Sequence, residues 1–304
     1  MFKSVFCDII FAMNRKIDYK INENDTGKTV EGFLKERGYT HQVLVRLKQT
    51  DHGILRNGIW AYTNERLCKD DLITVQIVEN ECSDNIAPVN LPLDIAYEDD
   101  DIIVINKPFD MPAHPSAGNH DNTLANALMY YYGSQNKPFV YRCINRLDRD
   151  TTGLTIVALA GGILGNAVAK RAIHRTYYAV CSGCTPACMR ISAPIARKDA
   201  STIERCVDFK RGENAVTDFI RIKYNPDNNL SLVKLRLLTG RTHQIRVHMK
   251  YIGFPLIGDF LYNPDYTYIS RQALHSGRLV FTHPVTGQKM NLISDIPSDM
   301  KSLF

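Results

Sequence analysis

Charged residues are crowded into one short segment of the chain. Residues 146–150 read Arg-Leu-Asp-Arg-Asp, so two carboxylates and two guanidiniums occupy five consecutive positions just before an apolar run. A purely structural loop rarely concentrates like and unlike charges so tightly, although an ion-pair turn exposed to solvent has the same appearance. We interpret the segment as a candidate functional site, with the ion-pair turn as the alternative.

A second segment, residues 175–180, reads Arg-Thr-Tyr-Tyr-Ala-Val and is a strand candidate. Alternate residues of a strand share a face, so Arg175 and Tyr177 are expected to point the same way. Tyr177 could therefore present its ring to a cleft. The alternative is a core tyrosine whose hydroxyl is hydrogen bonded, which is the commoner fate of a strand tyrosine.

A third segment, residues 238–248, reads Leu-Thr-Gly-Arg-Thr-His-Gln-Ile-Arg-Val-His. The Thr-Gly pair at 239–240 marks a turn, and a helix is expected to start near Thr242. On that helix Thr242, Arg246 and Lys250 follow at intervals of four residues and form one polar stripe.

Metal binding is not indicated by the histidines or the cysteines. His243 and His248 lie five residues apart, so they do not share a helix face as the two ligands of an i, i+4 site do. Cys181, Cys184 and Cys188 are clustered, but zinc needs a fourth ligand, and the conceivable ones are not at a standard spacing. We expect three free thiols, no metal and no cofactor.

The elements that position these segments are mostly strands. From residue 91 onward, strand-like runs outnumber helical ones and mostly follow one another directly, which predicts an α+β fold with a mixed, largely antiparallel sheet flanked by helices. The expected strands are residues 93–97, 102–105, 155–159, 176–181, 217–223, 231–237 and 279–281. The expected helices are residues 123–131, 163–171 and 244–251.

Residues 26–78 have the pattern of a smaller unit. An apolar face at residues 30–34 and a stretch at 42–49 predict two short helices, the Asn-Gly pair at 57–58 predicts a hairpin, and 72–78 alternates like a strand. Residues 79–90 are polar and without periodicity, as in a linker. We therefore expect a small α+β domain at 1–80, a linker at 81–90 and the larger domain at 91–304.

The composition limits the class of protein and its cellular compartment but does not identify a function. The 304 residues are 44% hydrophobic and 23% charged, which is typical of a soluble globular protein. We find no apolar run long enough to cross a bilayer and no secretory signal, so we expect a cytoplasmic protein with free cysteines. The formal charge of +5 permits an anionic partner without requiring one.

The three segments, in this order, resemble the motifs of the RluA-type RNA pseudouridine synthases. Residues 145–154 resemble the family's H-R-L-D-x-x-T-S-G-L, 175–183 its K-x-Y-x-x-x-x-x-G, and 238–248 its T-G-R-T-H-Q-I-R-x-H. Three positions depart from these motifs: Asn145 replaces histidine, Thr152 serine and Arg175 lysine. The small N-terminal unit resembles the S4 RNA-binding module.

The resemblance implies an isomerase that breaks the N-glycosidic bond of a uridine in RNA and rejoins the base through carbon, without a cofactor. It implies that Asp148 is the nucleophile or stabiliser, that Arg246 pairs with it, and that Tyr177 stacks on a base flipped out of its helix. It further implies RNA contacts by Arg146, Arg149, Lys107, His114, Arg241 and His243, and in the S4-like module by Arg46, Lys48 and Arg56. Ribosomal RNA is the first expectation for the substrate and transfer RNA the second, and we expect a monomer.

Two alternatives stay open from the sequence. A catalytically silent RNA-binding protein with the same fold would be expected to lack Asp148, Tyr177 or Arg246, and all three are present. A hydrolase could use Asp148 and Asp150 as a carboxylate pair, but residues two apart on a short loop seldom flank a scissile bond from opposite sides.

Overall fold

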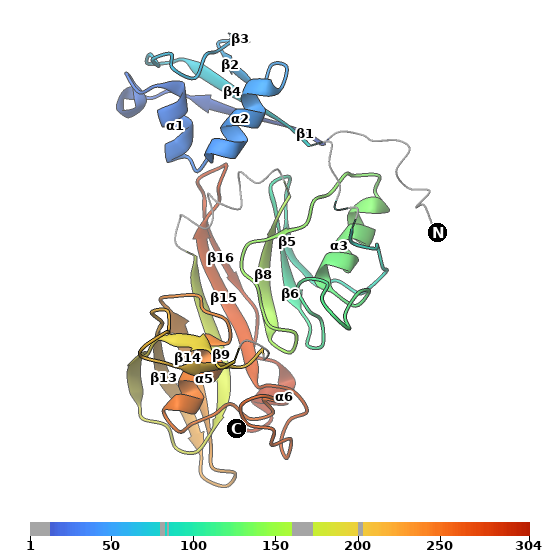
Figure 1. Cartoon of the computed structure of the whole chain (residues 1–304), viewed down its shortest axis with the longest axis vertical. Helices are drawn as coiled ribbons and strands as arrows, with labels where there is room; N and C mark the ends of the chain where they lie inside the picture. Colours follow the sequence, from blue (N-terminus) through green and yellow to red (C-terminus); the bar gives the residue numbers. More distant parts are fainter. Residues whose placement is uncertain (1–12, 80–82, 84, 160–172, 200–202) are drawn as a thin grey trace.

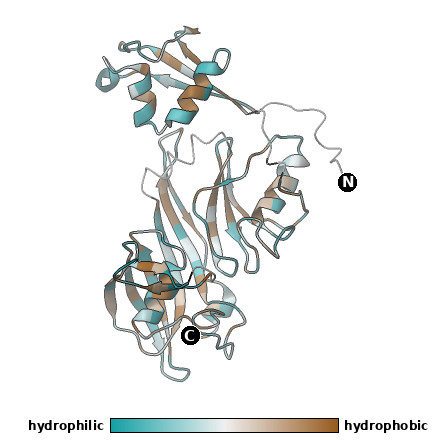
Figure 2. Cartoon of the chain, in the orientation of Figure 1, coloured by the Kyte–Doolittle hydropathy of each residue, from teal (hydrophilic) through white to brown (hydrophobic). Residues whose placement is uncertain are grey.

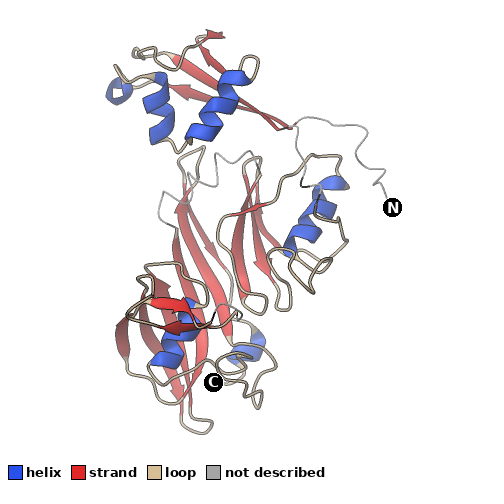
Figure 3. Cartoon of the chain, in the orientation of Figure 1, coloured by secondary structure: helices blue, strands red, loops and turns tan. Residues whose placement is uncertain are grey.

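The computed structural model describes residues 13–79, 83, 85–159, 173–199 and 203–304 (Figure 1). Strands make up most of its regular structure, and the few helices lie beside them (Figure 3). The chain forms a small four-stranded sheet near its N-terminus, a ten-stranded sheet and a separate two-stranded ribbon. Among the described residues, none of the helices combines the length and the apolar character that crossing a bilayer requires.

The N-terminal unit pairs its strands in the order β1-β4-β2-β3, with two helices against the sheet. Its elements are β1 (Met13–Lys20), a 3₁₀ turn (Glu23–Asp25), α1 (Val30–Glu36), α2 (His41–Gln49), β2 (Ile54–Arg56), β3 (Ile59–Trp60) and β4 (Leu72–Glu79). Both helices start where a threonine accepts a hydrogen bond from a main-chain amide, Thr29 from Gly32 and Thr40 from Val43. Hydrophobic and hydrophilic residues divide the surfaces of these helices in Figure 2, and the apolar ones enter a hydrophobic core within this unit.

Strand β1 was not predicted from the sequence. It pairs along its whole length with β4, yet at positions 14–20, whose burial is described, only Ile17 is fully buried. Its remaining positions are largely polar or charged, so no apolar alternation marks it as a strand.

The large sheet follows the order β10-β13-β14-β9-β15-β8-β6-β5, with β16 paired to β15 and β7 to β8. Its strands are β5 (Ile95–Glu98), β6 (Ile102–Lys107), β7 (Arg142–Cys143), β8 (Thr152–Ala158), β9 (His174–Ser182), β10 (Cys188–Ser192), β13 (Val216–Asn225), β14 (Leu230–Leu237), β15 (Leu274–Thr282) and β16 (Lys289–Ile293). Of the strand pairs that the structure describes, only β8 and β15 run parallel, so the predicted mixed and largely antiparallel sheet is confirmed. Strands β7, β10 and β16 and the ribbon β11 (Ile195–Arg197) and β12 (Arg205–Val207) were not predicted.

Among the described residues, the helices that accompany the sheet are α3 (Leu124–Gly133), α5 (Gln244–Tyr251) and α6 (Ser298–Lys301). Helix α3 starts in a capping box between Thr123 and Asn126 and packs on the β6–β8 side, while α5 packs on β9, β13 and β14. Helix α5 begins at Gln244 rather than near Thr242, because His243 adopts a left-handed backbone conformation with φ 57°. Helix α6 was not predicted, and the predicted helix at 163–171 lies outside the described residues.

The parallel contact between β8 and β15 fixes the loop that precedes β8. Gly153 pairs with Ser276 at φ +104°, and a Cβ atom there would lie 2.3 Å from the carbonyl oxygen of Ser276. Only glycine lets the two backbones approach this closely. The charged loop at 146–150 is therefore anchored by its C-terminal end to a strand more than a hundred residues away in the sequence.

Candidate active site

One cavity is lined by residues from all three of the segments that the sequence singled out. The loop before β8 contributes Asp148, strand β9 contributes Arg175 and Tyr177, and the turn leading into α5 contributes Arg241. The full lining is Arg146, Leu147, Asp148, Thr151, Arg175, Tyr177, Leu237, Gly240, Arg241, His243, Gln244, Ile245, Arg246 and Leu274. Segments far apart in the chain thus converge on one small space.

Asp148 and Arg246 form an ion pair at the base of this cavity. Nη1 of Arg246 donates to Oδ2 of Asp148 at 2.9 Å. The other edge of the guanidinium is held by Asp259, whose two carboxylate oxygens accept from Nε and Nη2, each at 2.7 Å. The side chains of Arg246 and Asp259 are 1% and 0% exposed, whereas that of Asp148 is 29% exposed. The buried carboxylate of Asp259 therefore fixes the guanidinium of Arg246, whose third nitrogen, Nη1, donates to the accessible carboxylate of Asp148.

The charge of this arginine is stabilised despite its burial. Burial lowers the pKa of Arg246, but the hydrogen bonds and charges of Asp259 and Asp148 outweigh it and raise the pKa overall. A bidentate guanidinium–carboxylate pair also fixes geometry more tightly than a point charge does. The Asp148 carboxylate thus faces a permanent, rigidly held positive charge.

Tyr177 lies on the cavity wall, on the same face of β9 as Arg175, as the strand period predicts. Its side chain is almost wholly buried, and burial raises the pKa of its hydroxyl, so the phenol is neutral. It packs in the hydrophobic cluster beneath the cavity. Tyr177 therefore packs in the core and also lines the cavity, so the two alternatives offered by the sequence, a core tyrosine and a ring presented to a cleft, both apply.

His243 also lines the cavity of Asp148. Its Nδ1 lies 3.0 Å from the hydroxyl of Tyr262, and its Nε2 lies 3.9 Å from Oδ2 of Asp148. Burial lowers the pKa of His243, which favours the neutral ring near neutral pH. The ring of Tyr262 also lies 5.0 Å from the Arg246 guanidinium carbon, in cation–π range.

The expectation that Lys107 contacts RNA is contradicted by its position. Its side chain is fully buried, and Nζ donates to the carbonyl oxygens of Pro108, Met111 and Arg149 at 2.7–2.8 Å. Burial lowers the pKa of Lys107 to about 7, against the opposing effect of Asp150 and Asp148. All three donors of an ammonium are occupied by main-chain oxygens, so Lys107 instead ties the loop of Asp148 to the turn after β6.

The other residues expected to touch RNA lie closer to the surface. Arg146 is exposed at the cavity, and Arg241, also exposed, bonds to Glu213 and to the carbonyl of Asn214. His114 is exposed beside the ring of Tyr141.

Arg149 and Asp150 are occupied with each other. Nε and Nη2 of Arg149 donate to the two oxygens of Asp150 at 3.1 and 3.2 Å. Asp150 does not line the cavity of Asp148. The arrangement gives no support to a hydrolase in which Asp148 and Asp150 act as a pair. Asp150 forms an ion pair within its own turn, with Arg149, whereas Asp148 pairs with Arg246 from a distant helix.

In the N-terminal unit, Arg46 and Lys48 are exposed on α2. Arg56 is half-buried and engaged by two carboxylates, that of Asp71 at 2.8 Å and that of Glu65 at 3.5 Å. Lys48 also has a carboxylate nearby, that of Glu31 at 3.6 Å.

Asn145, where the family motif has histidine, is buried and joins the loop to β8. Its Nδ2 donates to the carbonyl of Leu154 at 3.3 Å, and its Oδ1 accepts from the amide of Ile156 at 2.7 Å. A carboxamide supplies one donor and one acceptor, which this position uses.

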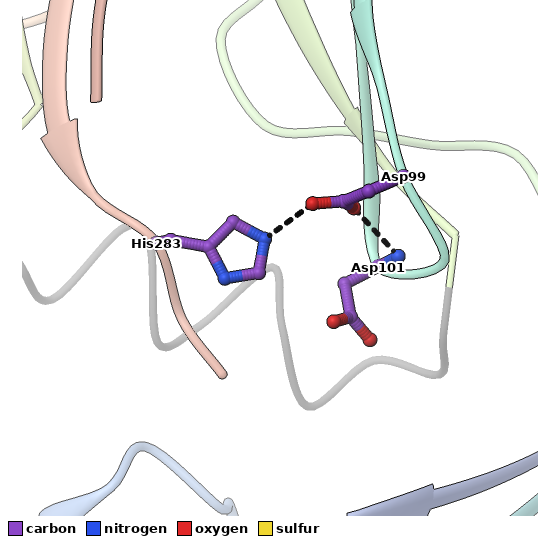
Figure 4. A group of neighbouring side chains, drawn as sticks. All are labelled: Asp99, Asp101 and His283. Atoms are coloured by element: carbon purple, nitrogen blue, oxygen red, sulfur yellow. Dashed lines mark hydrogen bonds and ion pairs between the residues drawn. The ribbon is translucent and has the colours of Figure 1, made fainter. Parts of the chain in front are cut away.

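The described cysteines are free thiols, with Cys181 buried and both Cys184 and Cys188 exposed. In the described part of the chain, the ligand atoms of one histidine–carboxylate group lie within 4.8 Å of one another, those of Asp99, Asp101 and His283 (Figure 4). Nε2 of His283 lies 2.9 Å from Oδ2 of Asp99, while the carboxylate of Asp101 is turned away from this contact.

Arg15 explains the orientation of Asp101. Its Nε and Nη2 donate to the two oxygens of Asp101 at 2.9 and 3.0 Å. The carboxylates of this group are satisfied by protein partners, and the group connects the N-terminal unit to the large sheet.

Sequence reasoning did not assign roles to Asp259 and Tyr262. Neither residue lies in the three segments that the sequence singled out. Asp259 and Tyr262 reach Arg246, and Tyr262 reaches His243, through the fold of the 258–262 turn.

Known proteins resemble this chain over most of its length. Residues 101–251 match the family model described as RNA pseudouridylate synthase. An uncharacterized RNA pseudouridine synthase of Bacillus subtilis, YjbO, is 38% identical over 91% of this chain and 98% of its own length. The ribosomal large subunit pseudouridine synthase D of Haemophilus influenzae is 41% identical over 75% of each chain. The solved human RNA pseudouridylate synthase domain containing 1 is 26% identical, with a TM-score of 0.55 over 67% of this chain and 83% of its own. This chain therefore belongs to the RluA-type family of RNA pseudouridine synthases.

Proposed function

We propose that this enzyme isomerises uridines in ribosomal RNA and that Asp148 carries the reaction. The observation that supports this most is the ion pair of Asp148 with a buried guanidinium inside a cavity that also holds Tyr177. Ribosomal RNA is favoured over transfer RNA because a relative at 41% identity is named a ribosomal large subunit enzyme.

The chemistry asks for an ionised carboxylate next to the sugar. Cleavage of the N1–C1′ bond builds positive charge on the ribose, which a carboxylate can stabilise or capture as a nucleophile. Arg246 orients the Asp148 carboxylate and places a positive charge beside it, because the position of Arg246 is itself set by Asp259. After the base turns, C5 bonds to C1′, the hydrogen of C5 leaves to solvent as a proton, and N1, freed from C1′, takes up a proton from solvent.

The other groups position the substrate. The uridine must leave its helix to reach Asp148, which costs a few kcal/mol of stacking. The ring of Tyr177 offers a face on which the extruded base stacks, and its neutral hydroxyl can donate a hydrogen bond. Arg146, exposed at the rim, is suited to fill the space that the base vacates.

We further propose that residues 1–80 act as an S4-like RNA-binding domain, joined by residues 81–90 to a catalytic domain at 91–304. Arg46, Lys48 and Arg56 would contact RNA, with Arg56 held in place by Asp71 and Glu65. Free thiols suit the cytoplasm. We expect a monomer, which size-exclusion chromatography with light scattering would check.

The decisive experiment uses RNA labelled with tritium at C5 of uridine. Ribosomal RNA from a strain lacking the gene is incubated with wild type, with Asp148→Asn and with Asp150→Asn. We expect wild type and Asp150→Asn to release tritium, and Asp148→Asn to be slower by at least about 1000-fold. Release by Asp148→Asn at the wild-type rate would overturn the role of Asp148. Absence of release by wild type would overturn the proposed substrate.

A further inference from the structure

Breaking the N1–C1′ bond of a uridine creates two charges, and Asp148 is suited to only one of them. The electron pair of the broken bond stays with the base. The ribose becomes positive, which a carboxylate stabilises, while the uracil becomes an anion whose charge is shared by N1, O2 and O4. A hydrogen-bond donor already in place at the uracil would lower the barrier to this step.

Four arginines line the cavity of Asp148, and two of them are already paired with carboxylates. Arg246 is held between Asp148 and Asp259. Arg241 forms an ion pair with Glu213. The charges of these two arginines are therefore balanced within the protein before any substrate arrives.

Arg175, in contrast, has no such partner within the described part of the chain. Its side chain is half-buried on β9, and its Nε is buried without a hydrogen-bond acceptor. None of the ion pairs among the described residues involves Arg175. A buried donor without an acceptor costs free energy, which is recovered when an acceptor arrives. Arg146, the remaining arginine of the cavity, is exposed to solvent and does not carry this cost.

Arg175 also stands where the edge of the base would lie. It precedes Tyr177 by two residues on the same face of β9, so the two side chains leave the strand about 7 Å apart. Its guanidinium lies against the turn before α5, since a Cβ atom on Gly240 would lie 3.4 Å from Nη2 of Arg175. Burial raises the pKa of Tyr177, and the charge of Arg175 opposes this rise. A uracil stacked on Tyr177 would therefore lie within the field of this guanidinium.

We propose that Arg175 is a catalytic residue that donates hydrogen bonds to the uracil as it leaves C1′ and thereby stabilises the uracil anion. The inference rests on the proposed function, which supplies the uridine, and deepens it by assigning the second of the two charges. The guanidinium stays protonated throughout. The electron pair of the anion forms the C5–C1′ bond, the proton of C5 leaves to solvent, and N1 takes up a proton from solvent. Because Arg175 gains a charged acceptor only as the bond breaks, it favours the transition state over the bound uridine.

The test compares Arg175→Gln and Arg175→Lys with a matched control, Arg278→Gln. Arg278 lies on β15 opposite Thr176, hence on the other face of the sheet from Arg175, and its exposed side chain donates to Asn291 at 2.8 Å. A ribosomal RNA fragment is transcribed either with uridine tritiated at C5 or with 5-fluorouridine, whose fluorine withdraws electrons and makes the uracil a better leaving group. Single-turnover rates at saturating enzyme are followed by tritium release and by the loss of 5-fluorouridine.

On uridine RNA we expect Arg175→Gln to react about 100-fold more slowly than wild type, and Arg175→Lys, which keeps a positive charge, to stay within about tenfold. On 5-fluorouridine RNA the defect of Arg175→Gln should shrink to about tenfold or less, because a better leaving group needs less stabilisation. Its affinity for RNA and its melting temperature should match those of wild type, because the substitution removes no ion pair. Arg278→Gln should behave as wild type does in every assay.

The proposal is wrong if Arg175→Gln reacts as fast as Arg278→Gln on uridine RNA. It is also wrong if Arg175→Gln loses the same factor on both RNAs, as a residue that only shapes the cavity would. A loss of RNA affinity with an unchanged rate at saturation would likewise overturn it, because Arg175 would then act in binding alone. Failure of wild type to convert either RNA would instead count against the proposed function.

Discussion

The buried guanidinium of Arg246 is the residue on which the site depends. It has a carboxylate on each side, one inaccessible and one facing the cavity. A buried ion pair contributes little net stability relative to apolar replacements, but breaking it by removing one partner is costly. Asp259 therefore stabilises the fold and positions Arg246 for Asp148.

Replacing Asp259 with asparagine should affect both stability and catalysis. The Arg246 charge would lose its buried counterion, so we expect a loss of about 3–5 kcal/mol in the free energy of unfolding and of about 100-fold in kcat. Urea denaturation and tritium release measure the two effects. Asp299→Asn is the control, because Asp299 binds Arg271 in the same two-point geometry but is 42% exposed. Equal losses in the two variants would contradict a special role for Asp259.

At the scale of elements, the parallel pair β8–β15 holds the catalytic loop. Beside Gly153, Oγ1 of Thr152 lies 2.9 Å from Nδ1 of His275, and Nε2 of that histidine lies 3.3 Å from the carbonyl of Ser294. His275 thus joins β8 to the segment after β16. Burial lowers its pKa from 6.5 to about 4.

This histidine predicts a pH dependence of stability. Between pH 6.5 and about 4 the unfolded chain binds a proton at His275 that the folded chain does not, so stability falls as the pH falls through this window. The full effect is about 3 kcal/mol. Thermal melting of wild type and His275→Gln from pH 7.5 to 4 should show a smaller decline in the variant. Parallel declines would show that His275 does not titrate in this way.

The sequence predicts some of these elements and residues better than others, for physical reasons. Strand β9 and helix α5 have strong local patterns, and the order of three motifs pointed to Asp148, Tyr177 and Arg246 before any contact was known. The short ribbon β11–β12 has no such pattern. The strand register that places Arg197 opposite Arg205 is visible only in the structure. Lys107 was misjudged because the carbonyl of Arg149, which occupies its amine, lies 42 residues further along the chain.

At the scale of the whole molecule, Arg15 fastens the N-terminal unit to the large sheet. Arg15 forms an ion pair with Asp101, which is buried in the turn between β5 and β6. Its Nη1 also lies 3.7 Å from Oδ2 of Asp100. Ala158, at the end of β8, packs into the core of the N-terminal unit. In Figure 1 the unit sits at one end of the large sheet, away from α5.

Removing this contact should loosen the two parts without altering the chemistry. Arg15→Gln leaves the buried Asp101 without its guanidinium, so we expect faster proteolysis between the two parts and a KM for RNA raised roughly tenfold, with kcat unchanged. Lys20→Gln is the control, since its pairing with Asp70 is exposed and lies within the N-terminal unit. A lowered kcat with unchanged KM would contradict a positioning role for this contact.

The ion pair between Asp148 and Arg246 also has a consequence for synthesis of the protein. Its partners are 98 residues apart, and the loop of Asp148 is further held by Gln272 and Leu274, more than 120 residues downstream. Contacts of such high sequence separation form late, because the chain must close a long loop before they contribute. During synthesis, a nascent chain that has not yet reached Leu274 therefore carries the Asp148 carboxylate without this support.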